Sequence, residues 1–435
     1  MNSQSISRLA LAVGLLLPAP VLAQQAMPAK AAPKTAWEAS QEHDDNATIS
    51  TGVAKARDPL NSATSTSVLK EPEIRRLGAG NIAEVMRTLP GIRVETDNAE
   101  TGNNYTIRGL PLVGDGAKYL QLQEDGLPVL EFGDISGLQI DTFIRNDLNL
   151  ASVESIRGGS ASTFASDAPG GVVNFISKTG EVEGGSIMAS AGLERGTRRI
   201  DADFGGHINS DWRFHVGGFY RVGEGPRTIG FDGFRGGQVK FNVTRQLDSG
   251  YIRFSAKVLD DRIIPSLGNV PLAVSGTDAD PQYASVPGFS AKNDMLYSRY
   301  FGRTQTFDPN SNISTRDFRD GYRVKSLTIG LEAQFEVGGW TVADRFRHER
   351  NSASGAQAVP LLAMPAAFMV PVFGGGATAT ATYFNGPLAG QAVAGNELLA
   401  LTVNADANFH DLDFTVNDLR ASRVFGVSGG ELTIT

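Results

Sequence analysis

The 435-residue sequence contains no cysteine. Disulfide bonds and thiolate metal sites are therefore excluded, and an exported form would depend on packing and backbone pairing for its stability. Lys and Arg total 39 against 47 Asp and Glu, which gives a formal net charge of -8. Because nucleic-acid binding needs clustered basic residues to neutralise phosphates, this balance argues against a nucleic-acid partner.

Long hydrophobic runs are also missing. The run Leu9–Leu17 follows Arg8 and precedes the small-residue pattern Val21–Ala23. It is too short to anchor the chain across ~30 Å of hydrocarbon, so Met1–Ala23 predicts a cleaved secretory signal peptide. After Ala23 no stretch approaches the ~20 apolar residues of a transmembrane helix. The mature chain is therefore predicted to be periplasmic, secreted or a closed β-barrel.

Residues 24–64 are rich in Ala, Gln, Asp and Pro and show little periodic hydrophobicity. This composition predicts a flexible segment. Farther along, Glu71–Leu89 has the pattern of two short helices, with Gly78 as a stop and Asn81 followed by Glu84 as in a capping box. Between Ile92 and Lys178, short apolar strands alternate with Gly-rich turns, which indicates a compact α+β domain.

From about Gly184 the pattern changes to strict alternation of apolar and polar residues. A soluble sandwich buries the apolar face of such strands in a core, whereas a transmembrane barrel turns it to lipid and the polar face to a lumen. Recurrent charges on the polar faces and two long connections, Asp260–Tyr322 and Asn351–Glu397, favour the barrel. The alternating segments are Arg199–Phe204, Trp212–Val216, Val239–Thr244, Ile252–Val258 and Ser326–Phe335.

Five motifs occur in order within Thr66–Thr179, and together they resemble the plug domain of TonB-dependent outer-membrane receptors. The fourth matches its family counterpart only loosely in spacing, and Gly159 stands where the family usually has Pro. The motifs are Leu77–Val94 with its Leu-Pro-Gly turn, Ile107–Leu110, Glu124–Val129, Val153–Gly158 and Ala168–Lys178.

This resemblance implies a mainly β fold, in which an α+β plug (residues 65–180) lies inside an antiparallel transmembrane β-barrel (residues 184–435). It implies active transport across the Gram-negative outer membrane, with a ferric siderophore as the family default and carbohydrate, cobalamin or haem as alternatives. The implied partners are TonB with ExbB and ExbD, outer-membrane lipid and the extracellular ligand. An enzyme is not implied. A passive porin and a secreted sandwich-type binding protein are the alternatives of another class.

The barrel region is short for this family. Twenty-two strands of ~10 residues need ~220 residues before any loop, and the two long connections occupy much of the chain after Gly184. Leu432–Thr435 also lacks the terminal aromatic residue expected of an outer-membrane barrel. We therefore expect about half of the strands, in a fragment or a truncated gene product that does not insert alone.

Three groups of residues are candidates for function. A short extended segment can pair with a strand of TonB by β-augmentation, although an ordinary linker explains it almost as well; its residues are Thr48, Ile49, Ser50, Thr51, Gly52 and Val53. Arg108 and Arg157 resemble the plug arginines that pair with barrel-wall carboxylates and lock the plug in place. Glu332 lies on a predicted lumen face and is the candidate partner for this lock.

The third group lies in the predicted outward loops Thr96–Asn103, Pro111–Lys118 and Leu130–Leu138, where we expect ligand contacts. Its members are Asp115, Lys118, Glu131, Phe132 and Asp134. We predict no cofactor, no metal site and no catalytic residue, because no two of the five histidines form a short ligand pair and no P-loop or nucleophile-elbow pattern occurs. The histidines are His43, His207, His215, His348 and His410.

Overall fold

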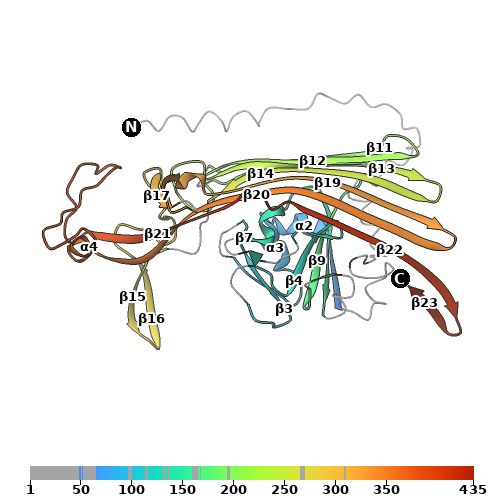
Figure 1. The fold of residues 1–435 in the computed structure, drawn as a ribbon, viewed down its shortest axis with the longest axis horizontal. Coiled ribbons are helices and arrows are strands. Elements are labelled where there is room, and N and C mark those ends of the chain that lie inside the picture. Colours follow the sequence, from blue (N-terminus) through green and yellow to red (C-terminus); the bar gives the residue numbers. More distant parts are fainter. Residues whose placement is uncertain are drawn as a thin grey trace, which may run out of the picture. The chain divides into compact units, whose positions relative to one another are not determined.

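A computed structural model describes residues 49, 51, 65–96, 100–112, 116–130, 134–135, 138–158, 165–166, 168–193, 196–264, 270–307 and 310–435. They all belong to one unit, His43–Thr435. The predicted signal peptide, Met1–Ala23, lies outside the described residues. This unit has two main parts. An α+β part within residues 65–177 is called the inner domain, and a large antiparallel sheet, called the wall, holds it on its concave face (Figure 1).

The inner domain is built on a five-stranded sheet of order β1-β8-β9-β4-β5. Strands β4 and β9 pair in parallel and the other neighbours are antiparallel. Smaller pairs join β2 to β3 and β6 to β7. The strands are β1 (Ser65–Lys70), β2 (Ile92–Glu95), β3 (Asn104–Ile107), β4 (Leu120–Glu124), β5 (Leu127–Pro128), β6 (Asp134–Ile135), β7 (Leu138–Gln139), β8 (Leu150–Arg157) and β9 (Gly171–Ser177).

Two short helices, α2 (Glu71–Leu77) and α3 (Ile82–Met86), confirm the helical prediction. Gly78 ends α2 with φ 61°, a left-handed conformation that glycine adopts without steric cost. Asn81 begins α3, and its side chain accepts a hydrogen bond from the Glu84 N–H. A 3-10 helix, η3 (Ile140–Phe143), follows β7. The apolar face of α3 and the central strands form one core, whose largest buried side chains include Met86, Tyr105, Phe143 and Phe175.

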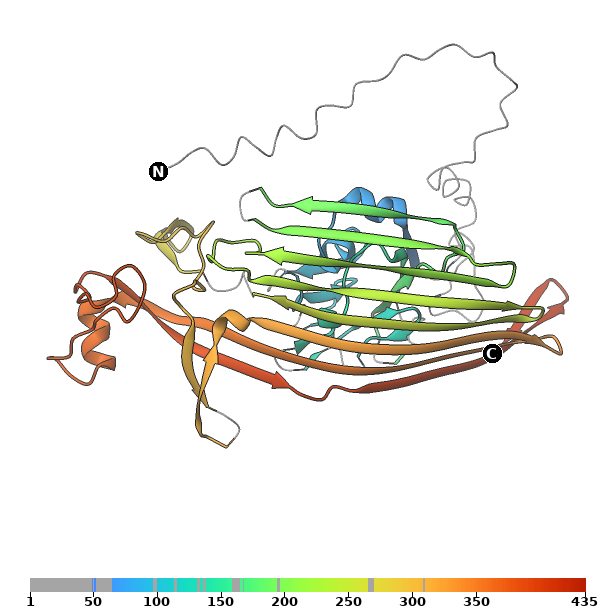
Figure 2. The same ribbon diagram turned by 90° about the horizontal axis from the view of Figure 1, so that it is seen from above.

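The wall is a ten-stranded antiparallel sheet of order β10-β11-β12-β13-β14-β19-β20-β22-β23 within the described residues, with β21 also paired to β20 (Figure 2). Each strand pairs with the strand before or after it across continuous ladders. The strands are β10 (Gly184–Ala191), β11 (Arg198–His207), β12 (Trp212–Gly223), β13 (Phe234–Leu247), β14 (Gly250–Ile263), β19 (Tyr322–Val337), β20 (Trp340–Pro365), β21 (Leu398–Phe409), β22 (Phe414–Val427) and β23 (Gly430–Ile434).

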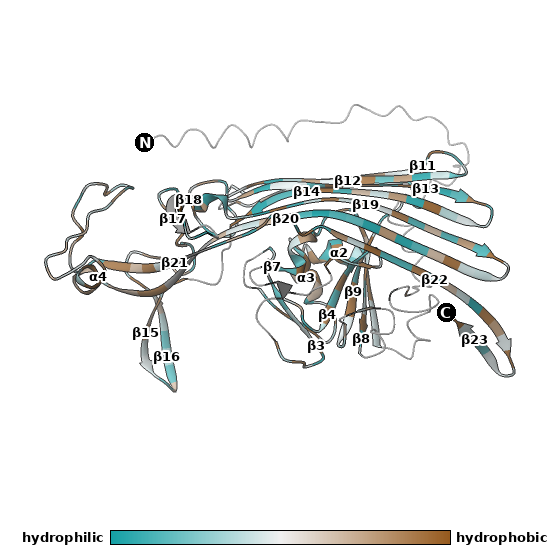
Figure 3. Cartoon of the chain, in the orientation of Figure 1, coloured by the Kyte–Doolittle hydropathy of each residue, from teal (hydrophilic) through white to brown (hydrophobic). Residues whose placement is uncertain are grey.

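The alternation of apolar and polar residues places the two kinds of side chain on opposite faces of the wall. Apolar residues point away from the inner domain: Ile200 and Val239 are 53% and 56% exposed. Their polar neighbours Asp201 and Lys240 are buried, at 0% and 8%. Hydrophobic and hydrophilic residues accordingly alternate along the strands in Figure 3. A sandwich would bury the apolar side, so the exposed apolar face agrees with the barrel prediction.

Connections differ in length at the two ends of the wall. Short turns occupy one end (residues 208–211, 248–249, 338–339 and 428–429), and longer connections the other (residues 192–197, 224–233, 264–321 and 366–397). We call these the short-turn end and the long-loop end. The long connections include β15 (Leu272–Thr277), β16 (Asp280–Ser285), β17 (Arg303–Phe307), β18 (Ile313–Asp317), η5 (Phe318–Asp320) and α4 (Ala366–Phe373).

One predicted boundary was wrong. The second long connection was expected to begin near Asn351, yet β20 continues to Pro365. Residues 352–358 are mostly Ser, Ala and Gly, so they show little alternation, but their backbone still pairs with β19 and β21. Among the described helices, none is long and apolar enough to cross a membrane.

Candidate functional site

Buried charges join the inner domain to the wall, and the first group centres on Glu124 at the end of β4. Its carboxylate accepts hydrogen bonds from the ammonium groups of Lys240 and Lys257. Arg347 donates to the Glu124 backbone carbonyl at 2.9 Å and pairs with Glu349 at 2.5 Å. Burial alone would raise the pKa of Glu124, but the cations outweigh it and hold that pKa well below its usual value. The inner domain is thus held by an ionised carboxylate among wall cations.

A second group of buried charges alternates between side chains of the inner domain and side chains of the wall. Asp261 on β14 accepts hydrogen bonds from Arg145 of the inner domain at 2.8 Å and from Arg221 of β12 at 2.6 Å. Arg221 also pairs with Glu100 of the inner domain at 2.8 Å. In the series Glu100–Arg221–Asp261–Arg145, the first and last residues therefore belong to the inner domain and the middle two to the wall. The side chains of Asp261, Arg145 and Arg221 are at most 3% exposed.

Asp141 supports the loop that carries Glu100. Its carboxylate, which is fully buried, accepts hydrogen bonds from the Gly102 N–H at 2.8 Å, the Asn103 amide at 2.6 Å and the Tyr105 hydroxyl at 2.7 Å. Burial raises the pKa of Asp141, and these hydrogen bonds oppose the rise. The sequence analysis did not select Asp141; the available signal was one carboxylate inside the otherwise uncharged, largely apolar stretch 138–144.

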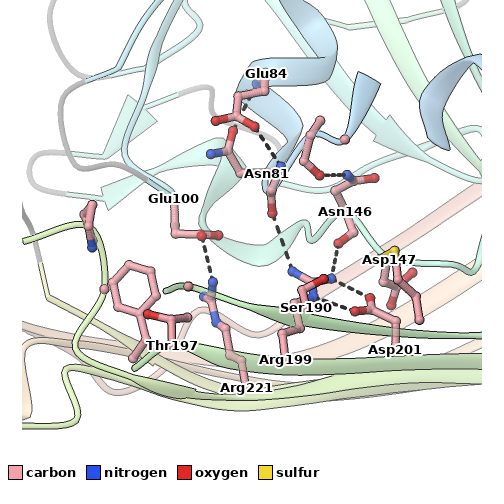
Figure 4. A pocket seen from close by; sticks show the side chains of 18 of the residues that line it. Asn81, Glu84, Glu100, Asn146, Asp147, Ser190, Thr197, Arg199, Asp201 and Arg221 are labelled. Carbon is pink, nitrogen blue, oxygen red and sulfur yellow. Dashed lines mark hydrogen bonds and ion pairs between the residues drawn. The ribbon is translucent and has the colours of Figure 1, made fainter. Parts of the chain in front are cut away.

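A cavity of about 740 Å³ lies between the helices of the inner domain and wall strands β10–β13 (Figure 4). This volume falls within the range of small-molecule sites. Arg199 and Arg221 reach the cavity from the wall, and Glu100 faces Arg221 across it. The Arg199 guanidinium pairs with Asp201 at 2.7 Å and donates to the Asn146 carbonyl at 2.6 Å. The cavity is lined by both charges and apolar groups, and thus suits a polar solute.

Two residues of the candidate TonB box are described. Ile49 is 1% exposed and packs in an apolar cluster with Ile156, Ala168 and Val172. Thr51 donates from its N–H and its hydroxyl to Glu154 at 2.9 and 2.5 Å, and the Asn174 amide donates to Thr51 at 2.9 Å. Thr48, Ser50, Gly52 and Val53 lie outside the described residues. Ile49 and Thr51 therefore rest on the inner domain, and their contact with TonB remains a prediction.

The predicted ligand residues are only partly described. Asp115, Glu131 and Phe132 lie outside the described residues. Lys118 is exposed beside β4, and Asp134 begins the two-residue strand β6, paired with Gln139. Their role in ligand contact remains a prediction.

The predicted arginine lock has different partners. Arg108 donates to the Arg157 carbonyl at 3.3 Å, and Arg157 donates to Ser67 at 2.8 Å, so both contacts stay within the inner domain. Glu332 pairs instead with Arg253 at 2.7 Å and Arg345 at 3.3 Å, both on the wall. The structure thus brings the two arginines together but does not bring Glu332 to either of them. The two arginines have hydrogen-bond acceptors within the inner domain, and Glu332 has cations within the wall. The predicted pairing of Glu332 with these arginines is therefore not found in the structure.

The replacement Glu332→Gln should therefore leave the inner domain in place. Its partners Arg253, Arg345 and the Tyr251 hydroxyl are all wall residues, and its side chain is 19% exposed. The wall should therefore lose some stability while the contacts of the inner domain stay unchanged. Limited proteolysis of the inner domain measures its retention. Faster cleavage of the Gln variant than of the parent would contradict this expectation.

No cluster of three or more His, Asp or Glu side chains in the described part of the chain could hold a metal ion. His215 lies 3.3 Å from Asp203, and Asp203 pairs with Lys178 at 2.8 Å. This group is a further link between the wall and the residues that follow β9.

Known proteins share this architecture. The family description "TonB-dependent Receptor Plug Domain" matches residues 58–172. Residues 58–172 therefore match the plug domain of TonB-dependent receptors. It is 25% identical over 244 residues to the "Ferric enterobactin receptor" of Pseudomonas aeruginosa, covering 47% of this chain and 33% of that protein. It is 29% identical over 156 residues to the "Catecholate siderophore receptor Fiu" of Escherichia coli K12, covering 34% and 18%.

Solved receptors agree with the fold. The crystal structure of the ferric-catecholate import receptor Fiu from E. coli K12 superposes with a TM-score of 0.57 at 14% identity, covering 87% of this chain and 49% of that one. At this identity the likeness concerns the fold alone. The matched regions span a third or less of the length of the two curated receptors. The inner domain corresponds to the plug of these receptors and is called the plug below, and the fold of the wall is like that of their barrel strands.

Proposed function

We propose that the protein takes up a ferric siderophore across the Gram-negative outer membrane, using energy delivered by TonB. One observation carries the proposal: a plug is held by buried polar pairs against the polar face of strands whose apolar face is exposed. Such a plug blocks passive flow, and polar pairs can be exchanged for water when force is applied. The printed names of the relatives, receptors for ferric enterobactin and for catecholate siderophores, support this substrate class.

The orientation follows from the lengths of the connections. Outer-membrane barrels place short turns in the periplasm and long loops outside, so we assign the long-loop end to the cell exterior. The signal peptide Met1–Ala23 would be cleaved on export. TonB, with ExbB and ExbD, would act on Thr48–Val53, and outer-membrane lipid would cover the exposed apolar face. Ligand would enter through the long loops and the cavity beside Arg199 and Arg221.

Deletion of Thr48–Val53 tests this proposal. We expect the full-length protein carrying the deletion to bind a ferric catecholate chelate at the cell surface. Cells that express it should take up the chelate no faster than cells without TonB, because the segment on which TonB would pull has been removed. Uptake of radiolabelled iron and surface binding at low temperature are the two measurements. An equal-length deletion at Lys30–Thr35 is the control and should transport normally. Uptake by the parent in cells without TonB would overturn the proposal and favour a passive porin.

A further inference from the structure

The face of the wall that points away from the plug carries a row of arginines. Strand pairing places Arg235, Arg262 and Arg323 directly opposite one another, on β13, β14 and β19. The same rung continues through Val222 of β12 to Arg198 of β11. These strands lie side by side in Figure 2. We call Arg198, Arg235, Arg262 and Arg323 the arginine row.

The arginine row borders the exposed apolar band of the wall. Arg235, Arg262 and Arg323 are each four residues from an exposed apolar side chain on their own strand, and side chains four residues apart in a strand share a face. These apolar residues are Val239, Val258 and Leu327, whose exposed fractions are 56%, 54% and 49%. The row therefore lies on the outward face, at the long-loop end.

Cations outnumber carboxylates at this border. Lys325 and Arg350 lie on the same face, one and two rungs closer to the apolar band. The outward carboxylate there is Asp260, which pairs with Arg323 at 2.8 Å. The loop carboxylates Asp232 and Asp320 are also near Arg262. Six cations thus face three carboxylates, counting the arginine row, Lys325 and Arg350 against Asp232, Asp260 and Asp320.

The opposite border of the apolar band has no such excess. At the short-turn end, the outward positions of β11–β14, β19 and β20 carry the charged residues Arg245 and Asp344, whose charges cancel. The excess of cations is therefore particular to the long-loop end.

The arginine row lacks anions. Like charges placed directly opposite each other destabilise a sheet, and among the described residues no hydrogen bond or ion pair joins the Arg235 or Lys325 side chain to another group. Arg262 donates from one Nη to the Asp232 carbonyl at 2.6 Å, but its Nε is buried and has no acceptor among the described residues. An external anion would offset these charges.

Phosphate on a lipid fits this surface better than a free anion does. A guanidinium group holds phosphate with two parallel hydrogen bonds. Strands are spaced ~4.8 Å apart, so Arg235 and Arg323 are ~10 Å apart and can hold two phosphates of one headgroup. The acyl chains of the same molecule would cover Val239, Val258 and Leu327, and their low dielectric strengthens the ion pairs beside them.

We propose that the arginine row binds a lipid whose headgroup carries at least two phosphates, in the outward leaflet of the membrane. The choice of leaflet rests on the orientation assigned under the proposed function. Asp232 and Asp320 belong to the connections 224–233 and 264–321, and they lie beside Arg262. The bound lipid would therefore also fix the bases of these two long loops.

A lipid titration of the full-length protein in a non-ionic detergent tests this inference, with diphosphoryl lipid A as the probe. Native mass spectrometry measures the fraction of protein that carries lipid. We expect the double variant Arg235→Gln/Arg323→Gln to bind diphosphoryl lipid A about tenfold more weakly than the parent, because it loses two charge-assisted contacts to phosphate. Both side chains are exposed, and Arg262 keeps its contact with Asp232.

Arg245→Gln is the matched control, because Arg245 lies on the same face of β13 at the opposite border. It should bind the lipid as the parent does. An equal loss in Arg245→Gln and in the double variant would mean that the arginine row has no special role, and would overturn the inference. Arg235→Lys/Arg323→Lys should recover part of the affinity, and a lysine variant no better than the glutamine variant would also overturn it.

Two further arms identify the ligand. The parent should bind monophosphoryl lipid A more weakly than diphosphoryl lipid A, and equal affinities would contradict recognition of two phosphates. Inorganic phosphate in large excess should leave the lipid bound; displacement would show a site for free phosphate and overturn the lipid proposal. Siderophore uptake is measured separately, so a parent that binds the lipid but takes up no ferric catecholate would contradict the proposed function and leave lipid binding standing.

Discussion

Replacing Glu124 by Gln should destabilise the protein by about 3–5 kcal/mol, because removing one partner leaves buried charges uncompensated. Lys240 and Lys257 both donate to this carboxylate, and all three side chains are less than 10% exposed. A neutral amide keeps the volume but cannot offset two ammonium groups. The expected consequence is a plug that detaches from the wall more readily. Denaturant unfolding in detergent and limited proteolysis of the plug measure the two effects.

Glu332→Gln provides the matched control, because it makes the same chemical change at a carboxylate that pairs only within the wall in the described contacts. The Glu124 variant should lose protection of the plug, and the Glu332 variant should keep it. Equal protease resistance in both variants would show that the charges around Glu124 do not hold the plug.

The same group gives a pH dependence with a definite sign. The pKa of Glu124 is lower in the folded protein than its usual value, so its contribution to stability is complete above about pH 4.3, the reference value for Glu. That contribution is lost as the pH falls from there toward the folded-state pKa. The difference in unfolding free energy between the parent and Glu124→Gln should therefore be constant from pH 7 to about pH 5 and should narrow below about pH 4. A difference that widens in acid would contradict the assignment.

Local patterns were sufficient to predict much of the fold. Gly78 and Asn81 set the two plug helices through backbone rules that act within a few residues. Alternation in segments such as Ile252–Val258 showed which residues share a face, because strand geometry imposes period two. It could not by itself show which face meets the plug and which is exposed. Which face meets the plug depends on how the neighbouring strands assemble into one sheet around it, and no single strand determines this.

The contacts between the plug and the wall could not be predicted from local sequence patterns. Glu124 was recognised only as part of a turn motif, because its partners Lys240 and Lys257 follow more than a hundred residues later. Glu332 was chosen because it lies on the polar face, which was correct, but the sequence gives no register between strands. In the structure Glu332 lies opposite Arg253 and Arg345 across the neighbouring ladders. Glu332 therefore pairs with Arg253 and Arg345 on the adjacent strands and not with an arginine of the plug.

Asp261→Asn is expected to have the other large effect. Asp261 is completely buried and lies between Arg145 and Arg221. The amide of Asn keeps one neutral acceptor oxygen but removes the negative charge that lies between the two guanidinium groups, which costs about 3–5 kcal/mol. Glu100 still offsets the charge of Arg221 in part. Loss of the Asp261 charge should therefore be more unfavourable at Arg145 than at Arg221.

A double-mutant cycle separates these contributions. If Arg145 depends on Asp261, then Arg145→Met combined with Asp261→Asn should cost less than the two single changes together, with a coupling of about 0.5–3 kcal/mol. Arg221→Met should couple to Asp261→Asn more weakly, because Glu100 remains beside Arg221. Unfolding free energies of the single and double variants measure both couplings. Strict additivity for Arg145 and Asp261 would mean that this buried pair does not fasten the plug, and that Glu124 with its lysines does so without it.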